Sequence, residues 1–173
     1  MHRWEINKLA TDKLNEMKAR FPEVLAGWTV SLNERAKRRL GCCKYSTKTI
    51  ELSSYLADIN LCEEEVMDTI LHEIAHAVAG SRAKHGYEWK VVAYRLGCKG
   101  TRTANLSALA KAGKCDMSVM EERLPYVAIC PVCHVKIFKA RKPRNNGSTV
   151  CKCLSGASYA TKLANRLMFG RTK

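Results

Sequence analysis

The stretch DTILHEIAHAVAG, residues 68–80, contains residues whose types and spacing can do hydrolytic chemistry. His72 and His76 are four residues apart, so on a helix both imidazoles lie on one face and can bind a single tetrahedral zinc ion. Glu73 lies about a quarter turn away, where its carboxylate can reach a water on that ion. Zinc lowers the pKa of the water towards about 7, so Glu73 can take its proton and later return it to a leaving amine. The H-E-x-x-H pattern therefore predicts a zinc hydrolase with Glu73 as general base and acid.

The residues around this pattern favour a metal site over three ordinary polar side chains on a half-exposed helix. A five-letter pattern also occurs by chance, so it is not sufficient alone. Here, however, the positions between and after the polar residues, IA and AVAG, are apolar and small, as in a buried helix. Burying one Glu and two His without partners would cost several kcal/mol, and a bound metal removes that cost.

Two common ways of completing such a zinc site are absent from the sequence. One class of zinc protease has a glycine and then a histidine shortly after the second His of the pattern, and here these positions are Ala79 and Arg82. Another class takes an acidic ligand from a following helix, and no carboxylate lies between Glu88 and Asp116. The third ligand must therefore come from a different place.

His85 is the best candidate for that third ligand. It lies nine residues beyond His76, and Gly80 allows the chain to turn, so the imidazole of His85 can return to the metal. Glu88 is the competing ligand, although it is better placed to support the site from outside or to begin a helix. A fourth position left open for water would complete a catalytic zinc site.

A second metal site is predicted by the cysteines near the C-terminus. Cys130-x-x-Cys133 is followed, after 17 intervening residues, by Cys151-x-Cys153. Two cysteine pairs are typical of a closed, structural four-cysteine zinc ribbon. The second pair is one residue shorter than usual, so His134 stays open as an alternative to Cys153 as fourth ligand. A ribbon this small buries little apolar surface, and we expect it to need zinc in order to fold.

The excess of positive over negative charge lies entirely in the second half of the chain. The formal net charge is +14; residues 1–83 hold 12 Lys/Arg and 12 Asp/Glu, whereas residues 84–173 hold 18 against 4. This asymmetry favours a polyanionic partner, with DNA the first candidate, over a merely soluble basic surface. Phe138 offers a stacking surface for an unpaired base. Five cations between the cysteine pairs are candidate phosphate contacts, unless they form only a solvated loop: Lys136, Lys139, Arg141, Lys142 and Arg144.

These candidate residues must be positioned by an α+β fold. The apolar patterns predict a first helix, three short strands, a long helix from a capping Asn60 to Gly80, and an amphipathic helix closed by Gly97. The strands are mostly rich in β-branched or aromatic residues, which suggests a small antiparallel sheet. The helices are expected at 4–20, 60–80 and 87–97, and the strands at 28–33, 39–45 and 49–53.

Three stretches of this chain resemble the SprT-like family, which includes the bacterial SprT proteins and Spartan-type DNA-dependent proteases. They are LHEIAHAVAG followed by HGYEWK, the upstream segment LGCCKYSTKTIELSSYL, and the basic cysteine module, and the resemblance extends over roughly residues 5–155. It implies a minimal zincin-like metalloprotease core followed by a small β zinc ribbon. It also implies that His72, His76 and His85 bind the catalytic zinc and that Glu73 is the general base.

The function implied by the resemblance is metal-dependent peptide hydrolysis linked to DNA, as in the removal of proteins covalently trapped on DNA. We expect one catalytic and one structural Zn²⁺, with DNA and a protein substrate as partners and no base-reading pattern. The competing function is a nucleic-acid-binding zinc protein, such as a transcription-associated factor, with structural zinc and little or no protease activity. A metal-free helical adaptor is the third hypothesis.

The expected organisation is a metalloprotease core at 1–115, a linker at 116–125, the zinc ribbon at 126–156 and a basic tail at 157–173. No apolar run approaches the roughly 20 residues that cross a bilayer, and the N-terminal segment has an amphipathic helical pattern instead of that of a signal peptide. We therefore expect a cytoplasmic protein without a membrane partner, able to associate with the nucleoid. The cysteines are then thiols or metal ligands, since disulfides are rare in that compartment.

Overall fold

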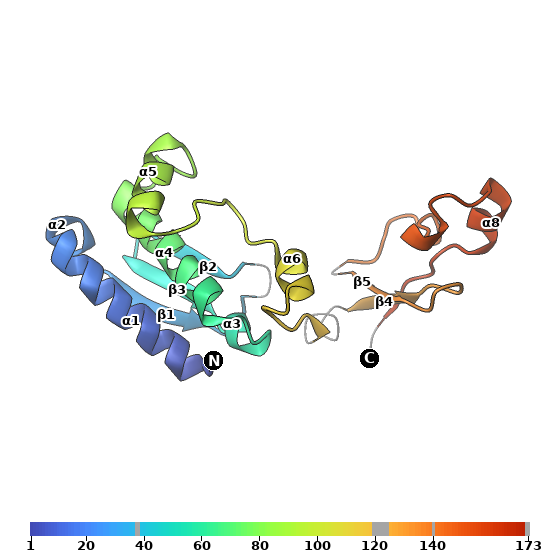
Figure 1. Ribbon diagram of the computed structural model, residues 1–173, viewed down its shortest axis with the longest axis horizontal. Coiled ribbons are helices and arrows are strands. Elements are labelled where there is room, and N and C mark those ends of the chain that lie inside the picture. The colour runs from blue at the N-terminus through green and yellow to red at the C-terminus, as the bar shows by residue number, and fades with distance from the viewer. Residues whose placement is uncertain (37–38, 119–124, 140, 172–173) are drawn as a thin grey trace. The chain divides into compact units, whose positions relative to one another are not determined.

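The computed structural model describes residues 1–36, 39–118, 125–139 and 141–171 (Figure 1). Its internal contacts divide the chain into two compact units, Met1–Asp116 and Met117–Lys173. Each unit has its own sheet and its own buried residues, so each is described by itself. Among the described residues, no helix combines the length and the apolar character needed to cross a membrane.

The first unit begins with a long helix, α1 (Arg3–Arg20), which is followed by the short α2 (Pro22–Leu25). One stripe of α1 is buried because its apolar residues recur at helical spacing. The pyrrolidine ring of Pro22 suits the first turn of α2, where no backbone N–H is needed. The buried residues of α1 are Ile6, Ala10, Leu14 and Met17.

The sheet of the first unit is mixed, which corrects the expectation of a wholly antiparallel one. Its strands are β1 (Thr29–Asn33), β2 (Gly41–Lys44) and β3 (Thr49–Ser53), in the order β1-β3-β2. The hairpin β2–β3 is antiparallel, but β3 inserts beside β1 and pairs with it in parallel. Strand patterns mark where strands occur but do not say which neighbours they pair with, so this insertion was not predictable. It leaves β2 at one edge of the sheet.

The long helix α4 (Glu63–Ala79) carries the H-E-x-x-H residues. It begins three residues later than expected, because Asn60 adopts a left-handed conformation (φ 45°) after the short α3 (Tyr55–Asp58) and does not cap α4. Three glutamates occupy its first turn, where they favour the positive end of the helix dipole. Gly80, with φ 82°, ends the helix as expected.

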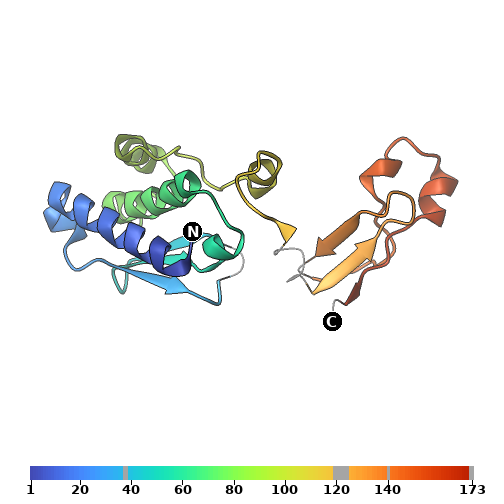
Figure 2. The same ribbon diagram turned by 60° about the horizontal axis from the view of Figure 1, so that its bottom comes forward.

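Helices α1 and α4 pack on the sheet, and α5 (Tyr87–Leu96) packs on α4 (Figures 1 and 2). Helix α1 contacts β1, whereas α4 contacts β2 and β3. Gly97 ends α5 in a left-handed conformation, as expected from the sequence. The chain then continues through residues 98–105 to the short α6 (Leu106–Lys111).

The second unit is built around a three-stranded antiparallel sheet in the order β5-β4-β6. Its elements are β4 (Tyr126–Ile129), β5 (Lys136–Lys139), a 3₁₀ turn η1 (Lys152–Leu154), α8 (Tyr159–Ala164) and β6 (Gly170–Arg171).

The segment expected to be a basic tail returns to this sheet. Its last described residues form β6 beside β4, and Leu167 and Phe169 are buried in the small core of the unit. That core also contains Ala128 and two cysteines, Cys130 and Cys151. Apolar side chains of the segment expected to be a basic tail, 157–173, thus complete the small core of the second unit.

Candidate metal centres

Three histidines meet at one point in the first unit. His72 and His76 come from α4, and His85 comes from the turn before α5. The Nε2 atom of His85 lies 3.1 Å from Nε2 of His72 and 3.1 Å from Nε2 of His76. Nitrogens bound to one tetrahedral zinc at the usual bond length are about 3.3 Å apart, so the three rings have the spacing of a metal site.

The turn between α4 and α5 brings His85 back to α4. Gly80 leaves the helix with φ 82°, and Lys84 also has a positive φ of 46° just before the histidine. Glu88, the competing ligand, lies exposed in the first turn of α5 and is not among the residues that converge with the histidines. The donor set that the fold offers is thus three imidazoles.

The ring of Trp89 packs against all three histidine rings. Its side chain is fully buried, and its ring centroid lies 4.7 Å from those of His72 and His85. It stacks on His76 at 5.2 Å with an interplanar angle of 26°. The sequence indicated a core role for Trp89, and its position four residues after His85 was the only signal that it also packs against the histidines.

Burial keeps the histidines in the form that binds metals. Burial lowers the pKa of His76 to about 4, with smaller contributions from His72 and His85. It is also the main cause of the lowered pKa values of His72 and His85. Neutral imidazoles present a lone pair to a metal ion, so these rings are ready to bind zinc at neutral pH.

Glu73 lies in a nearly closed space between α4 and the edge strand β2. Only 6 % of its surface is exposed, and burial raises its pKa to about 7, against opposing effects of Arg39 and the backbone of Cys43. A nearby metal ion would oppose this rise. A carboxylate with this pKa can both accept and return a proton near neutral pH.

Gly41 provides the space that Glu73 occupies, and no pattern in the sequence indicated this. A Cβ atom at Gly41 would lie 2.7 Å from both Cγ and Oε1 of Glu73. No side chain other than hydrogen fits there unless the carboxylate moves. Gly41 is the first residue of β2, so the edge of the sheet limits where the Glu73 carboxylate can lie.

Four cysteine sulfurs meet at the second candidate centre, in the ribbon. Sγ of Cys130 lies 3.6 Å from that of Cys153, and Cys133 and Cys151 are separated by the same distance of 3.6 Å. Sulfurs around one tetrahedral zinc are about 3.8 Å apart, so the spacing fits a closed four-thiolate site. His134, the alternative ligand, is exposed with φ 56° and is not part of this group.

The short spacing of the second cysteine pair is explained by the 3₁₀ turn η1. Cys151 precedes the turn and Cys153 lies inside it. The backbone changes from extended at Cys151 (φ −70°, ψ 148°) to the tight turn that contains Cys153, and this bend brings both sulfurs into the same four-cysteine group. On the other side, Cys130 and Cys133 flank a tight knuckle in which His134 N donates to the carbonyl of Cys130 at 3.0 Å.

The five cations predicted to contact phosphate are all exposed in the second unit. Lys136 and Lys139 lie on β5, and Arg141, Lys142 and Arg144 follow it. Within the described ranges none of the five forms an ion pair, although Lys139 lies 5.6 Å above the ring of Phe169. Phe138 is half-buried on β5.

Comparison with known families places most of the first unit in a single group. The model of the SprT-like family matches residues 7–109, a range that contains all three histidines, Glu73 and Gly41. No curated protein and no solved structure matched the chain.

Proposed function

The chain belongs to the SprT-like family, and we propose that it is a zinc-dependent metalloprotease that cleaves proteins on or near DNA. The observation that carries this proposal is the convergence of His72, His76 and His85 beside the buried Glu73. The proposal assigns two zinc ions, one catalytic at the histidines and one structural at the ribbon cysteines.

The residues of the first unit are suited to peptide hydrolysis. Zinc held by the three histidines would supply a Lewis acid for a water and for the scissile carbonyl. Glu73 would take a proton from the attacking water as the new C–O bond forms. It would then return that proton to the amine nitrogen as the C–N bond breaks, which leaves Glu73 ready for another cycle.

The edge strand β2 supports a protein as the substrate. In the described part of the sheet β2 pairs with β3 on one side only, so no strand pairs with its other edge. An extended peptide can pair with such an edge without relying on particular side chains. Gly41 of β2 lies next to the side chain of Glu73. A peptide bound at the edge of β2 would therefore lie near the proposed general base.

The charge of the second unit supports DNA as the partner. Residues 117–173 hold 11 Lys/Arg and 2 Asp/Glu, and the five candidate phosphate contacts are exposed. Such a surface binds the phosphate backbone without reading bases. We propose that the ribbon brings the protease to DNA, where proteins trapped on DNA are its substrates.

Incubation with a DNA-bound basic protein tests the proposal. The reaction is run with the full chain, with and without DNA and with and without a zinc chelator. We expect cleavage that requires zinc and is faster with DNA. Binding to DNA without any cleavage would instead support the alternative of a nucleic-acid-binding zinc protein. Cleavage that persists after chelation would overturn the zinc mechanism.

A further inference from the structure

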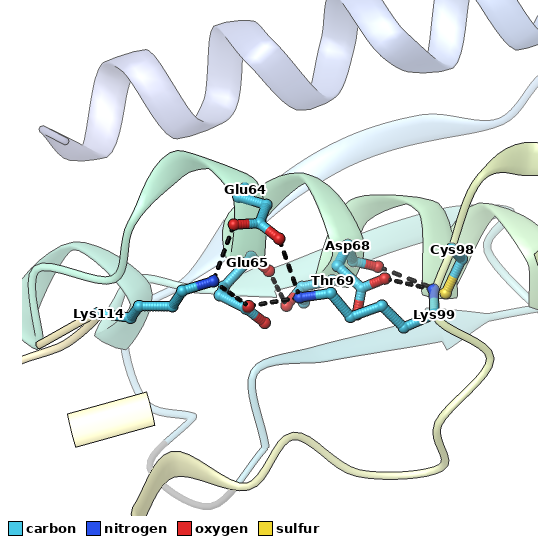
Figure 3. Close-up of polar contacts among 7 residues, drawn as sticks. All are labelled: Glu64, Glu65, Asp68, Thr69, Cys98, Lys99 and Lys114. Atoms are coloured by element: carbon cyan, nitrogen blue, oxygen red, sulfur yellow. Dashed lines mark hydrogen bonds and ion pairs between the residues drawn. The ribbon is translucent and has the colours of Figure 1, made fainter. Parts of the chain in front are cut away.

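Helix α4, which carries the H-E-x-x-H residues, is held at both ends by other segments of the first unit. At its start, Glu64 and Glu65 pair with two lysines that follow α5 in the chain, Lys99 and Lys114, as Figure 3 shows. Because these lysines neutralise both carboxylates, we assign no metal site to the group that they form with Cys62. The contact at the other end of α4 is of a different kind and reaches one of the histidines.

Tyr45 makes the contact at the end of α4. Its hydroxyl donates to the carbonyl oxygen of His76 at 3.0 Å. The N–H of Gly80, which ends the helix, donates to the same oxygen, also at 3.0 Å. The backbone of a candidate zinc ligand is therefore bonded to the side chain of a different element, close to the point where the chain turns towards His85.

The ring of Tyr45 is fixed by packing, so its hydroxyl has a defined direction. Tyr45 follows the last residue of β2 and is half-buried. Its ring lies edge-on to that of the buried Trp28, with the centroids 5.9 Å apart and an interplanar angle of 87°. A tyrosine held in this way packs through its ring and keeps its one polar atom for a hydrogen bond.

Strand β2 thus meets α4 at two places, one at each end of the strand. At its first residue, a Cβ atom on Gly41 would lie 2.7 Å from Cγ of Glu73, so the backbone of β2 lies against this side chain. Just beyond its last residue, Tyr45 is bonded to His76. Two contacts at opposite ends fix both the position and the direction of a strand across a helix, whereas one contact would let it pivot.

We infer that Tyr45 is a positioning residue: its bond to the His76 carbonyl holds the edge strand β2 in one alignment along α4, so that a peptide paired with β2 lies in register with Glu73. This inference rests on the proposed function, in which the edge of β2 receives the substrate. Because a reacting carbonyl must be placed to within a fraction of an ångström, the alignment of β2 should affect the rate of the chemical step.

Two lysines provide matched controls, because each makes a similar link that does not join β2 to α4. Lys48 lies in the same turn as Tyr45, and its Nζ donates to the carbonyl of Ala26 at 3.0 Å. Lys114 is bound to α4, but at the start of the helix, 2.9 Å from Glu64. If Tyr45 only stabilised the turn or the helix, the loss of either lysine would have the same consequence as the loss of its hydroxyl.

The test compares Tyr45→Phe, Lys48→Met and Lys114→Met with wild type in the zinc-loaded full chain. Phenylalanine keeps the ring against Trp28 and removes only the hydroxyl. The kinetic measurement is cleavage of a DNA-bound basic protein, with kcat and KM determined separately. We expect Tyr45→Phe to lower kcat about tenfold and to keep KM within about twofold of wild type, because the strand edge still binds the peptide but no longer aligns it. Both lysine variants should keep the wild-type kcat.

The direction of β2 relative to α4 gives a readout that does not depend on activity. Residual dipolar couplings of backbone amides report this direction in solution. We expect the couplings of residues 41–44 to change relative to those of α4 in Tyr45→Phe and to stay as in wild type in both lysine variants. Unchanged couplings in Tyr45→Phe, an unchanged kcat, or an equal change in either lysine variant would overturn the inference.

The two measurements separate this inference from the proposed function. If β2 changes direction in Tyr45→Phe but the wild-type chain cleaves no protein, the proposed function is refuted and the alignment of β2 by Tyr45 remains. If the wild-type chain cleaves its substrate and Tyr45→Phe does so with the same kcat, the proposed function remains and the inference is refuted.

Discussion

Glu73 lies so close to the backbone of β2 that its position depends on Gly41, which has no side chain beyond hydrogen. The carboxylate is buried and fills the space where Gly41 lacks a Cβ atom. A buried base cannot move aside at no cost, because interiors are closely packed. The position of the Glu73 carboxylate is therefore sensitive to any substituent at Gly41.

Gly41→Ala should lower the rate of cleavage while the protein keeps its zinc. The added methyl group would push the carboxylate away from the metal-bound water, and a misplaced base typically costs about 10- to 100-fold in rate. The measurement is kcat/KM on a protein substrate together with the zinc content. Gly156→Ala, where no atom lies within 4 Å of the new Cβ, is the control. Unchanged cleavage by Gly41→Ala would show that Glu73 does not need this space.

The sequence indicated the histidine group and Glu73 more directly than the residues that pack against them. The positions of His72 and Glu73 along the sequence predict how their side chains are arranged, because both residues lie on one helix and the geometry of a helix is regular. Gly41 and Trp89 act through contacts between different elements, and a spacing along the chain cannot reveal such contacts. His85 is an intermediate case. Its distance along the chain showed that it could approach His72 and His76, but not that it must do so.

At the scale of elements, the sheet of the first unit is tied together by Glu51 on its central strand. Glu51 is 7 % exposed; it pairs with Lys44 on β2 and accepts from Asn33 on β1 at 2.8 Å. Burial alone would raise its pKa, but the bonds from Lys44 and Asn33 and the charges of Lys44 and Arg39 lower it overall. The ionised carboxylate thus favours the folded state.

Glu51→Gln should destabilise the protein by about 1–2 kcal/mol at pH 7, from the lost charged hydrogen bond. Because the folded pKa of Glu51 is below the unfolded value of about 4.3, its contribution is complete above that pH. It is lost as the pH falls through the folded pKa. Urea unfolding of both proteins between pH 7 and pH 3 should show the difference in stability shrinking at the acid end. A difference that stays constant would show that ionisation of Glu51 does not stabilise the fold.

The ribbon depends on its metal more than the first unit does. Its small buried core contains two of the four candidate ligands, Cys130 and Cys151, together with three apolar residues. A core of this size is too small to offset the loss of chain entropy without zinc.

Removing zinc from the full chain should therefore unfold the second unit and leave the first unit folded. In proton–nitrogen NMR spectra, we expect chelation to collapse the dispersed signals of residues 125–171 while most signals of 1–116 remain. Cys133→Ser should have the same effect without a chelator. Ribbon signals that stay dispersed without metal would refute a structural zinc there.

Helices and strands with a long, regular apolar pattern were predicted more accurately than short ones. Helices α1 and α5 have repeated apolar spacing and clear ends, and the structure confirms both. No periodic pattern in the sequence predicts the pairing of β1 with β3. The same holds for β6, which has only two residues. The start of α4 shifted because Asn60, which suits a helix cap, equally suits a left-handed turn.

At the scale of the whole molecule, the histidine group and most of the positive charge lie in different units. The three histidines lie in the first unit, whereas residues 117–173 of the second unit hold 11 Lys/Arg and 2 Asp/Glu, which is +9 of the net charge of +14. This division was visible in the sequence because composition does not depend on tertiary contacts. This division fits the proposed function, in which binding to DNA determines which proteins are cleaved.

Neutralising the five exposed cations of residues 136–144 should flatten the salt dependence of DNA binding. Each phosphate contact that is lost should lower the slope by about 0.9 on logarithmic axes for duplex DNA. The measurement is the binding constant between about 50 and 200 mM salt. Lys8 and Lys13, which already pair with Asp12 and Glu16, are the control changes. An unchanged slope would show that DNA binds elsewhere or not at all.

The most direct test of the central claim is Glu73→Gln in the full chain, measured for zinc content and for cleavage of a DNA-bound basic protein. Glutamine has nearly the same shape and keeps the histidines in place, but it cannot take up a proton. We predict two zinc ions per chain, as in wild type, and a loss of cleavage of at least about 100-fold. Cleavage at the wild-type rate with full zinc content would contradict the assignment of Glu73 as general base and, with it, the proposed mechanism.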